Sequence, residues 1–208
     1  MFRRARFLAA LLTAAVIASM TAIWALPVAA QSGKRSEQAG KPQVSRIDRT
    51  RSLDFLFGAL KLAPDDTTAK AIEERIWTVW TASRSDTANL LMMRVKTAIE
   101  AKDLDLAVRL LDGIVKIKPD YIEGWNRRAT IFYIKKDYGR AIADIRQVLK
   151  REPRHFGALA GLGLILQDIG DDKQALEVYR RALEVYPRME RIPDIVKTLQ
   201  EKIEGRDI

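Results

Sequence analysis

Few residues in this sequence have types and spacings that could do chemistry. The chain has no cysteine and a single histidine, His155, so a disulfide framework, thiolate catalysis and the usual Cys/His zinc sites are excluded. Adjacent acids occur in three places, but helix caps and solvated helix faces account for them without a catalytic cleft. These pairs are Asp65-Asp66, Glu73-Glu74 and Asp171-Asp172. The sequence therefore predicts a protein that is not an enzyme and that has no metal or cofactor.

Gly161-Leu162-Gly163 and His155 are the remaining chemical candidates. The glycine pattern resembles a fragment of a dinucleotide-binding loop, but it follows no predicted strand and lacks the third glycine. We expect these glycines to allow helices to approach closely instead. His155 follows Arg154 in a predicted turn, and two interpretations stay open. The ring is either a pH-sensitive partner contact or a turn residue that bonds locally.

The composition is that of a folding chain with a basic surplus. Of the 208 residues 48% are hydrophobic and 30% are charged, and the formal net charge is +9. The length allows one domain or two small ones. Lys and Arg are dispersed along the chain and interleaved with acids, so we expect no nucleic-acid partner.

The first part of the chain, over 1–30, predicts export from the cytoplasm. Three arginines precede an uncharged run over 7–26, and Val28 and Ala30 offer small side chains before polar Gln31. This pattern is typical of a secretory signal peptide, here cleaved after Ala30. The uncharged run also reaches the length of about 20 residues that spans a bilayer, so an uncleaved signal anchor is the alternative. Either one places the rest of the chain in the periplasm, in the second case held at the inner membrane.

The segment 31–51 predicts a flexible basic linker. It is polar, contains Gly33, Gly40 and Pro42, and shows no apolar periodicity. Its cations outnumber its acids, which suits binding to anionic lipid or cell-wall polymer, although a solvated spacer has the same composition. From Ser52 onward apolar residues recur every three to four positions, which predicts helices throughout.

An internal repeat organises the second half of the chain. Prolines and alanines recur at one constant spacing, and each alanine precedes its proline by the same distance. The recurring sets are Pro119, Pro153 and Pro187; Ala107, Ala141 and Ala175; Leu91, Trp125 and Leu159; and Lys102-Asp103, Lys136-Asp137 and Gly170-Asp171. Agreement of so many positions in one register indicates a true structural repeat.

These residues and their common spacing resemble the tetratricopeptide repeat (TPR) family, whose unit is a helix–turn–helix of about 34 residues. The resemblance implies an all-α fold: a right-handed superhelical solenoid of antiparallel helix pairs, which stack to bury their apolar faces. The predicted segments are a signal peptide or anchor (1–30), a linker (31–51), a degenerate helical pair (52–87), three TPR units (88–121, 122–155 and 156–189) and a capping helix (190–208).

The resemblance also implies where a partner binds. First helices line the concave groove of a curved stack, and the family's peptide or helix partners lie there. On the matching register the partner-contacting candidates are Asn89, Met92, Lys96, Glu123, Asn126, Arg127, Thr130, Tyr133, Leu164 and Gln167. Certain members grip a C-terminal carboxylate with basic residues. Met92, Gly157 and Gly161 stand at those places here, so we expect no such clamp.

The sequence therefore predicts a non-catalytic periplasmic scaffold that binds protein segments in its groove and serves envelope assembly, maturation or secretion. The alternative is a basic tethering protein, whose linker binds anionic lipid or cell-wall polymer while the repeats only support it.

Overall fold

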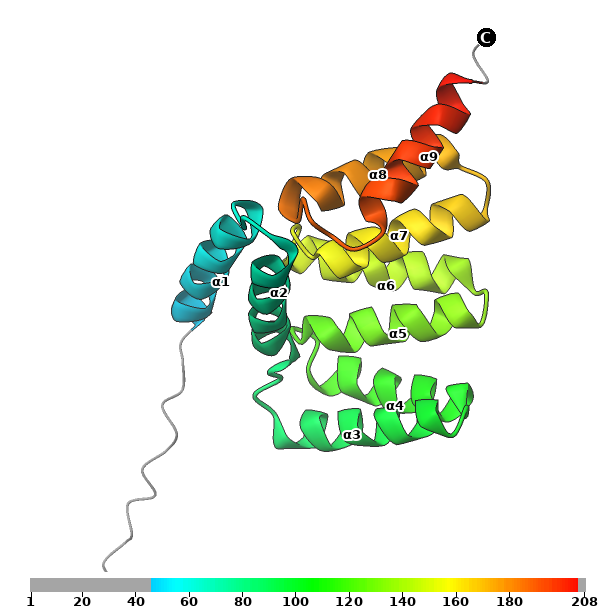
Figure 1. Cartoon of the computed structure of the whole chain (residues 1–208). Coiled ribbons are helices and arrows are strands. Elements are labelled where there is room, and N and C mark those ends of the chain that lie inside the picture. The colour runs from blue at the N-terminus through cyan, green and yellow to red at the C-terminus, as the bar shows by residue number, and fades with distance from the viewer. Residues whose placement is uncertain (1–45, 206–208) are drawn as a thin grey trace, which may run out of the picture. The chain divides into compact units, whose positions relative to one another are not determined.

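The computed structural model describes residues 46–205. The predicted signal peptide or anchor and the part of the predicted linker over 31–45 lie outside the described residues. Between residues 46 and 205 the chain forms nine helices and no strand, which confirms the all-helical prediction (Figure 1). None of these nine helices is both long enough and apolar enough to cross a membrane.

The helices form consecutive pairs followed by one last helix. They are α1 (Arg46–Lys61) and α2 (Asp66–Thr81), α3 (Asp86–Glu100) and α4 (Leu104–Ile117), α5 (Ile122–Ile134) and α6 (Tyr138–Arg151), α7 (Phe156–Asp168) and α8 (Asp172–Val185), and α9 (Ile192–Glu204). From α3 to α9 each helix packs against the next along the chain (Figure 1). The three pairs from α3 to α8 therefore stack as a solenoid.

Helix α1 begins at Arg46, six residues ahead of Ser52, where the helical pattern of the sequence begins. The last part of the predicted linker is thus helical. No proline or glycine occurs between Pro42 and Gly58, and arginine is a good helix former, so nothing in the sequence stops the helix from starting before Ser52.

The turn inside each stacked pair is built in the same way three times. Lys102, Lys136 and Gly170 have φ angles of 60°, 58° and 84°, the left-handed conformation that ends a helix. The next residue is an aspartate whose side chain accepts a backbone N–H from the first turn of the second helix and so caps it. Its own N–H closes the first helix, as in Asp137 N to Phe132 O at 2.8 Å. The recurring residue pair in the sequence is the signal for this turn.

Small residues set the spacing between the stacked helices. Ala107, Ala141 and Ala175 are fully buried, so a larger side chain at any of them would have to displace a neighbour. At Gly163 in α7 an added Cβ would lie 2.5 Å from the ring of Tyr179 in α8. Apolar clusters around these residues hold the pairs together by removing surface from water.

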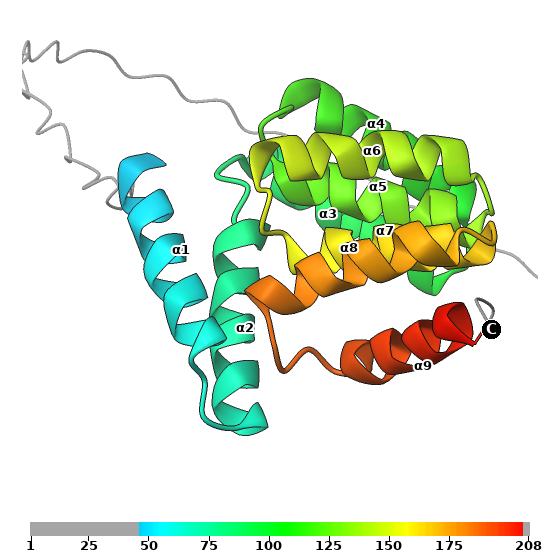
Figure 2. The same ribbon diagram turned by 90° about the horizontal axis from the view of Figure 1, so that it is seen from above.

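The first pair, α1 and α2, does not continue the stack. Helix α2 packs against α1 and α5, α1 also contacts α8, and α2 stands across the ends of the stacked helices (Figures 1 and 2). In the repeat register Glu73 and Trp80 of α2 stand where α4 has Ala107 and Ile114. A charged residue and an indole are too bulky for these close-packed positions. Helix α2 instead contributes to an apolar cluster with α7 and the end of α8.

Helix α9 closes the other end of the stack. Ile192 and Leu199 are buried in the cluster formed with α8, and Lys202 Nζ pairs with Asp172 Oδ2 at 2.6 Å. Lys197 and Glu201 are exposed. An apolar inner face and a polar outer face are what the terminal element of a repeat stack needs to remain soluble.

Candidate protein-binding groove

A hollow of about 540 Å³ lies where α3 and α5 meet the end of α2. Its walls are largely apolar, contributed by Met92, Met93, Val95, Ile99 and Tyr121. Five of the predicted contact residues line it, namely Asn89, Met92, Lys96, Glu123 and Arg127.

A second hollow of about 340 Å³ adjoins the first, because Glu123 and Arg127 line both. Two further predicted residues of α5 also line it, together with one residue of α2 and one of α7. These four are Asn126, Thr130, Trp77 and Gly157. We call the two hollows together the α3–α5 groove. It runs over the first helices of the stacked pairs, the surface that the repeat register indicated.

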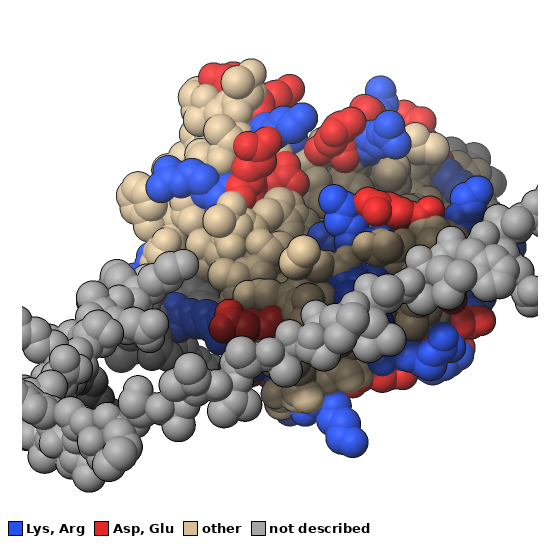
Figure 3. Space-filling view, turned by 90° about the horizontal axis from the view of Figure 1, so that it is seen from below, with Lys and Arg blue, Asp and Glu red and all other residues tan. Residues whose placement is uncertain are grey.

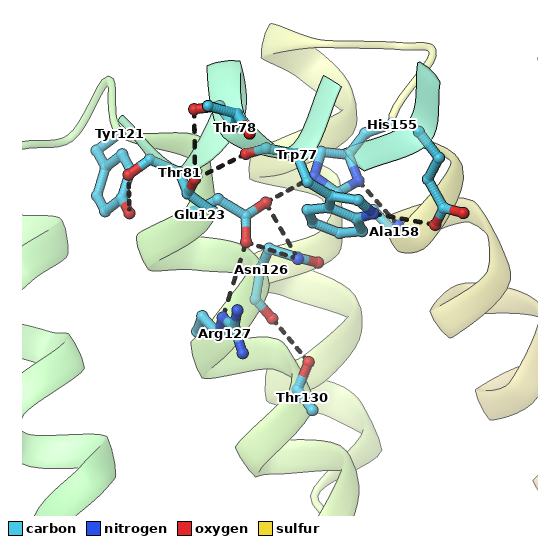
Figure 4. A network of polar contacts seen from close by, with 11 residues as sticks. Trp77, Thr78, Thr81, Tyr121, Glu123, Asn126, Arg127, Thr130, His155 and Ala158 are labelled. Carbon is cyan, nitrogen blue, oxygen red and sulfur yellow. Dashed lines mark hydrogen bonds and ion pairs between the residues drawn. The ribbon is translucent and has the colours of Figure 1, made fainter. Parts of the chain in front are cut away.

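Glu123 forms the floor of both hollows and is 1% exposed. Its Oε1 lies 2.8 Å from His155 Nε2, and Asn126 Nδ2 donates to its two oxygens at 3.3 and 3.2 Å (Figure 4). Arg127 Nε lies 3.9 Å from Oε2. A buried carboxylate is tolerated only when it is paired and hydrogen-bonded, and these groups meet that need. The structure thus engages Glu123, predicted as a partner contact, in an internal network between α5 and α7.

His155 is fully buried and joins three helices. Its Nδ1 accepts the backbone N–H of Ala158 at 3.0 Å, which makes it the N-cap of α7. Because Nδ1 accepts, the proton of the neutral ring lies on Nε2, which donates to Glu123. The ring also stacks on Trp80 of α2, with centroids 4.0 Å apart and planes 8° apart. Its burial and these bonds correspond to the local turn role and leave no ring atom facing a partner.

Tyr121 fastens the end of α2 beside the groove. Its hydroxyl donates to the Thr81 carbonyl oxygen at 3.0 Å (Figure 4). Burial, together with the nearby charge on Glu123, raises the pKa of Tyr121 to about 12. The phenol therefore stays neutral and remains a donor at physiological pH.

Lys96 and Arg127 give the α3–α5 groove a basic margin. The Lys96 side chain is 80% exposed and lies 3.8 Å from Glu100, and that of Arg127 is 52% exposed. The Lys96–Glu100 pair is exposed on both sides and contributes little to stability, so the charge of Lys96 is available to a ligand. Arg127 lies 3.9 Å from buried Glu123, but half of its side chain is exposed, so it also presents charge at the margin. Elsewhere the charges are mixed, and Figure 3 shows Lys and Arg interspersed with Asp and Glu.

Three predicted contact residues, Tyr133, Leu164 and Gln167, line neither of these hollows. They lie in the last turns of α5 and α7. The Tyr133 ring lies 6.1 Å from the ring of Tyr138, and Gln167 Oε1 accepts the Tyr179 hydroxyl at 2.7 Å. Leu164 is 39% exposed. They form a separate zone at the distal end of the first helices.

Arg128 links two stacked pairs, through a buried ion pair to α6 and a half-exposed one to α4. It donates to Asp144 in α6 at 2.7 and 2.8 Å and to Asp112 in α4 at 2.6 Å. A two-pronged guanidinium–carboxylate contact fixes geometry as well as charge. No group of His, Asp and Glu side chains within residues 46–205 is placed to hold a metal ion.

The sequence did not predict the groove-lining residues that lie outside the first helices of the stacked pairs. Trp77 and Thr81 of α2 and Tyr121 before α5 all line the groove. A signal was present, because Trp77 and Trp80 of α2 are bulkier than Leu111 and Ile114, which stand at the same register positions in α4. An apolar face that cannot stack must pack elsewhere, although the pattern alone does not say where.

A TPR repeat-containing protein of Rhizobium etli is 42% identical to this chain over 153 residues, which cover 74% of this chain and 75% of the relative. The chain belongs to the tetratricopeptide repeat family. The profile described as Tetratricopeptide repeat matches residues 126–190 of this TPR protein. The small glutamine-rich tetratricopeptide repeat-containing protein 2 of Saccharomyces cerevisiae is 26% identical over 95 residues, covering 46% of this chain and 28% of the relative.

Solved TPR structures share the fold. The crystal structure of MamA has a TM-score of 0.54 at 18% identity and covers 78% of this chain and 87% of its own. The first TPR of Spaghetti (RPAP3), bound to an HSP90 peptide, has a TM-score of 0.55 at 16% identity. The match covers 58% of this chain and 95% of that structure's chain. Identities this low establish the fold alone. TPR proteins are in general non-catalytic scaffolds for protein–protein interaction.

Proposed function

We propose that this TPR protein is a periplasmic scaffold that binds a segment of another protein in the α3–α5 groove and serves envelope assembly, maturation or secretion. The observation that supports the groove is the pair of adjoining hollows along α3 and α5. The TPR of Spaghetti bound to an HSP90 peptide and the TPR2B domain of yeast Sti1 in complex with pHsp70 supply precedents for peptide binding by this fold.

The chemistry of the groove favours an apolar segment with an acidic neighbour. Met92, Met93 and Ile99 offer apolar surface. The cations at the margin are Lys96, which pairs loosely with exposed Glu100, and Arg127. Methionine adapts its shape to varied side chains, which suits a surface that accepts more than one sequence. The positions that would clamp a free C-terminal carboxylate carry Met92 and two glycines, so an internal segment fits this groove better than a chain end.

Export is the second part of the proposal, and its support is the sequence over 1–30. Fractionation of cells that express the full chain should place it in the periplasm, beginning at Gln31. Retention of Met1 in the membrane fraction would favour the anchor, and a purely cytoplasmic protein would contradict export.

A photo-crosslinking residue at Met92 or Asn126, introduced in living cells, tests the groove. We expect a discrete crosslinked protein, identified by mass spectrometry, from both positions. The same residue at exposed Arg146 on α6 is the matched control and should give no such product. Arg127→Glu should weaken the crosslink at Met92, while Arg146→Glu should not. Crosslinks from Arg146 together with none from the groove would refute the proposal.

A further inference from the structure

The α3–α5 groove is not the only surface that the stack leaves open, because α3 has no stacked helix before it. In later pairs one side of the first helix is covered by the preceding second helix. An added Cβ at Gly124 of α5 would lie 2.9 Å from Ile114 of α4. Ile131, two turns on, is 1% exposed and belongs to the cluster of α3 and α4. Positions 124 and 131 therefore mark the side of α5 that faces backward along the stack.

The same register positions in α3, one repeat unit earlier, are uncovered. Leu90 corresponds to Gly124 and is 59% exposed, and Thr97 corresponds to Ile131 and is also exposed. Met93, which also lines the α3–α5 groove, lies one turn from Leu90 at the border of the two surfaces and is 68% exposed. Large apolar side chains this open are unusual on a helix whose other faces are packed, so this side of α3 has the character of an interface.

Arg94 adds a charge to this side. Its counterpart in α5, Arg128, reaches back to Asp112 of the preceding helix at 2.6 Å. No hydrogen bond or ion pair within residues 46–205 engages Arg94, since no helix precedes α3 in the stack. Leu90, Met93, Arg94 and Thr97 thus form a surface, which we call the α3 edge, with apolar side chains around a cation that has no partner among the described helices.

Helix α2 does not cover the α3 edge. It has Thr78 where α4 has Asp112 and Trp80 where α4 has Ile114, so it offers no carboxylate and an indole in place of a smaller side chain. It packs on α1 and α5 instead, and its Trp80 stacks on His155, the N-cap of α7. The chain's own preceding helix is therefore committed elsewhere.

We propose that the α3 edge docks an amphipathic helix of a partner protein that carries a carboxylate opposite Arg94 and a small residue opposite Leu90. The carboxylate follows from the pair that Arg128 makes with Asp112. The small residue follows from the tight fit at Gly124, because a leucine at that register leaves no room for a side chain as large as Ile114. A second copy of the same edge would bring cation against cation, so self-association is disfavoured.

The test uses the full chain and a peptide with the sequence of α4 that carries Ile114→Ala. A staple on the side of the peptide opposite to the residues that match Asp112 and Ile114 keeps it helical. Methyl NMR should show shifts at Leu90 and Thr97 and none at Ile99 in the groove. Arg94→Glu should weaken binding about tenfold, the ratio expected for losing a hydrogen bond to a charged group. Arg146→Glu on α6 is the matched control and should leave the affinity unchanged.

Charge reversal completes the test. A peptide in which the residue matching Asp112 is lysine should bind the Arg94→Glu chain better than the unchanged chain. The proposal is overturned if the stapled peptide leaves Leu90 and Thr97 unshifted, or if it shifts only groove residues. It is also overturned if sedimentation shows the chain dimerising through the α3 edge, since a second copy is then the occupant.

Discussion

Replacing His155 with alanine should detach α2 from the stacked helices. The change removes the N-cap of α7, the hydrogen bond to the Glu123 carboxylate and the ring that stacks on Trp80. Loss of a cap costs about 1 kcal/mol. Losing the hydrogen bond that the neutral ring donates to the buried Glu123 carboxylate costs about 1.5–3 kcal/mol. Because Asn126 still donates to Glu123, we expect a loss of about 3 kcal/mol in total.

Two companion variants separate these contributions. His155→Asn keeps a capping side chain but cannot reach Glu123, so it should be about 1 kcal/mol more stable than His155→Ala. Glu123→Gln keeps an acceptor for Nε2–H and removes the buried charge. In the His155→Ala chain it should therefore recover stability, because an unpaired amide is cheaper to bury than an unpaired carboxylate.

Urea unfolding followed by tryptophan fluorescence measures these differences, with Trp80 as a reporter beside the substituted ring. A His155→Ala chain within about 1 kcal/mol of the unchanged chain would refute the reasoning. So would strict additivity of His155→Ala and Glu123→Gln, since residues in direct contact should couple.

Two further predictions concern the core and alkaline pH. Ala141→Leu should destabilise by about 1–3 kcal/mol through overpacking, while Ala143→Leu, exposed on the same helix, should be nearly neutral; equal melting temperatures for the two would contradict the packing. Tyr121 has a raised folded-state pKa, so its contribution is fully present below about pH 10 and lost as the pH rises through about 12. Tyr121→Phe should reduce this alkaline loss in a circular-dichroism titration without abolishing it, because burial also raises the pKa of Tyr179 and Tyr186. An unchanged titration profile would show that the phenol is not buried as described.

The stacked pairs were predictable because their determinants are local. The left-handed residue and capping aspartate at Lys136-Asp137 close a turn within a few residues, and the alanine at 141 follows at a fixed distance. Each of the three units repeats these features, so the same turn and the same packing position can be recognised three times in one sequence. Register also placed five of the predicted residues around one hollow without knowledge of any long-range contact.

The placement of the first pair was not predictable, since contacts between distant residues hold it. Tyr121 bonds to Thr81 and Tyr186 bonds to Glu73, in both cases across more than one full repeat unit of the chain. No periodicity encodes such pairings. The burial of Glu123 has the same origin: register placed it on the groove side, but Trp77 of α2 and His155 of α7 make it a floor residue with no free carboxylate.

Arg188, just after α8, donates to the carbonyl oxygens of Ala63 and Pro64 at 3.0 and 2.6 Å and to Asp66 at 2.8 Å. A simple repeat array unfolds from its termini, because each repeat contacts only the repeats next to it. Here Arg188 joins the loop between α1 and α2 directly to the segment that follows α8, so the first pair contacts the third repeat as well as its neighbours in the sequence. The last unit cannot peel away without releasing the first pair, so denaturation should be cooperative rather than stepwise.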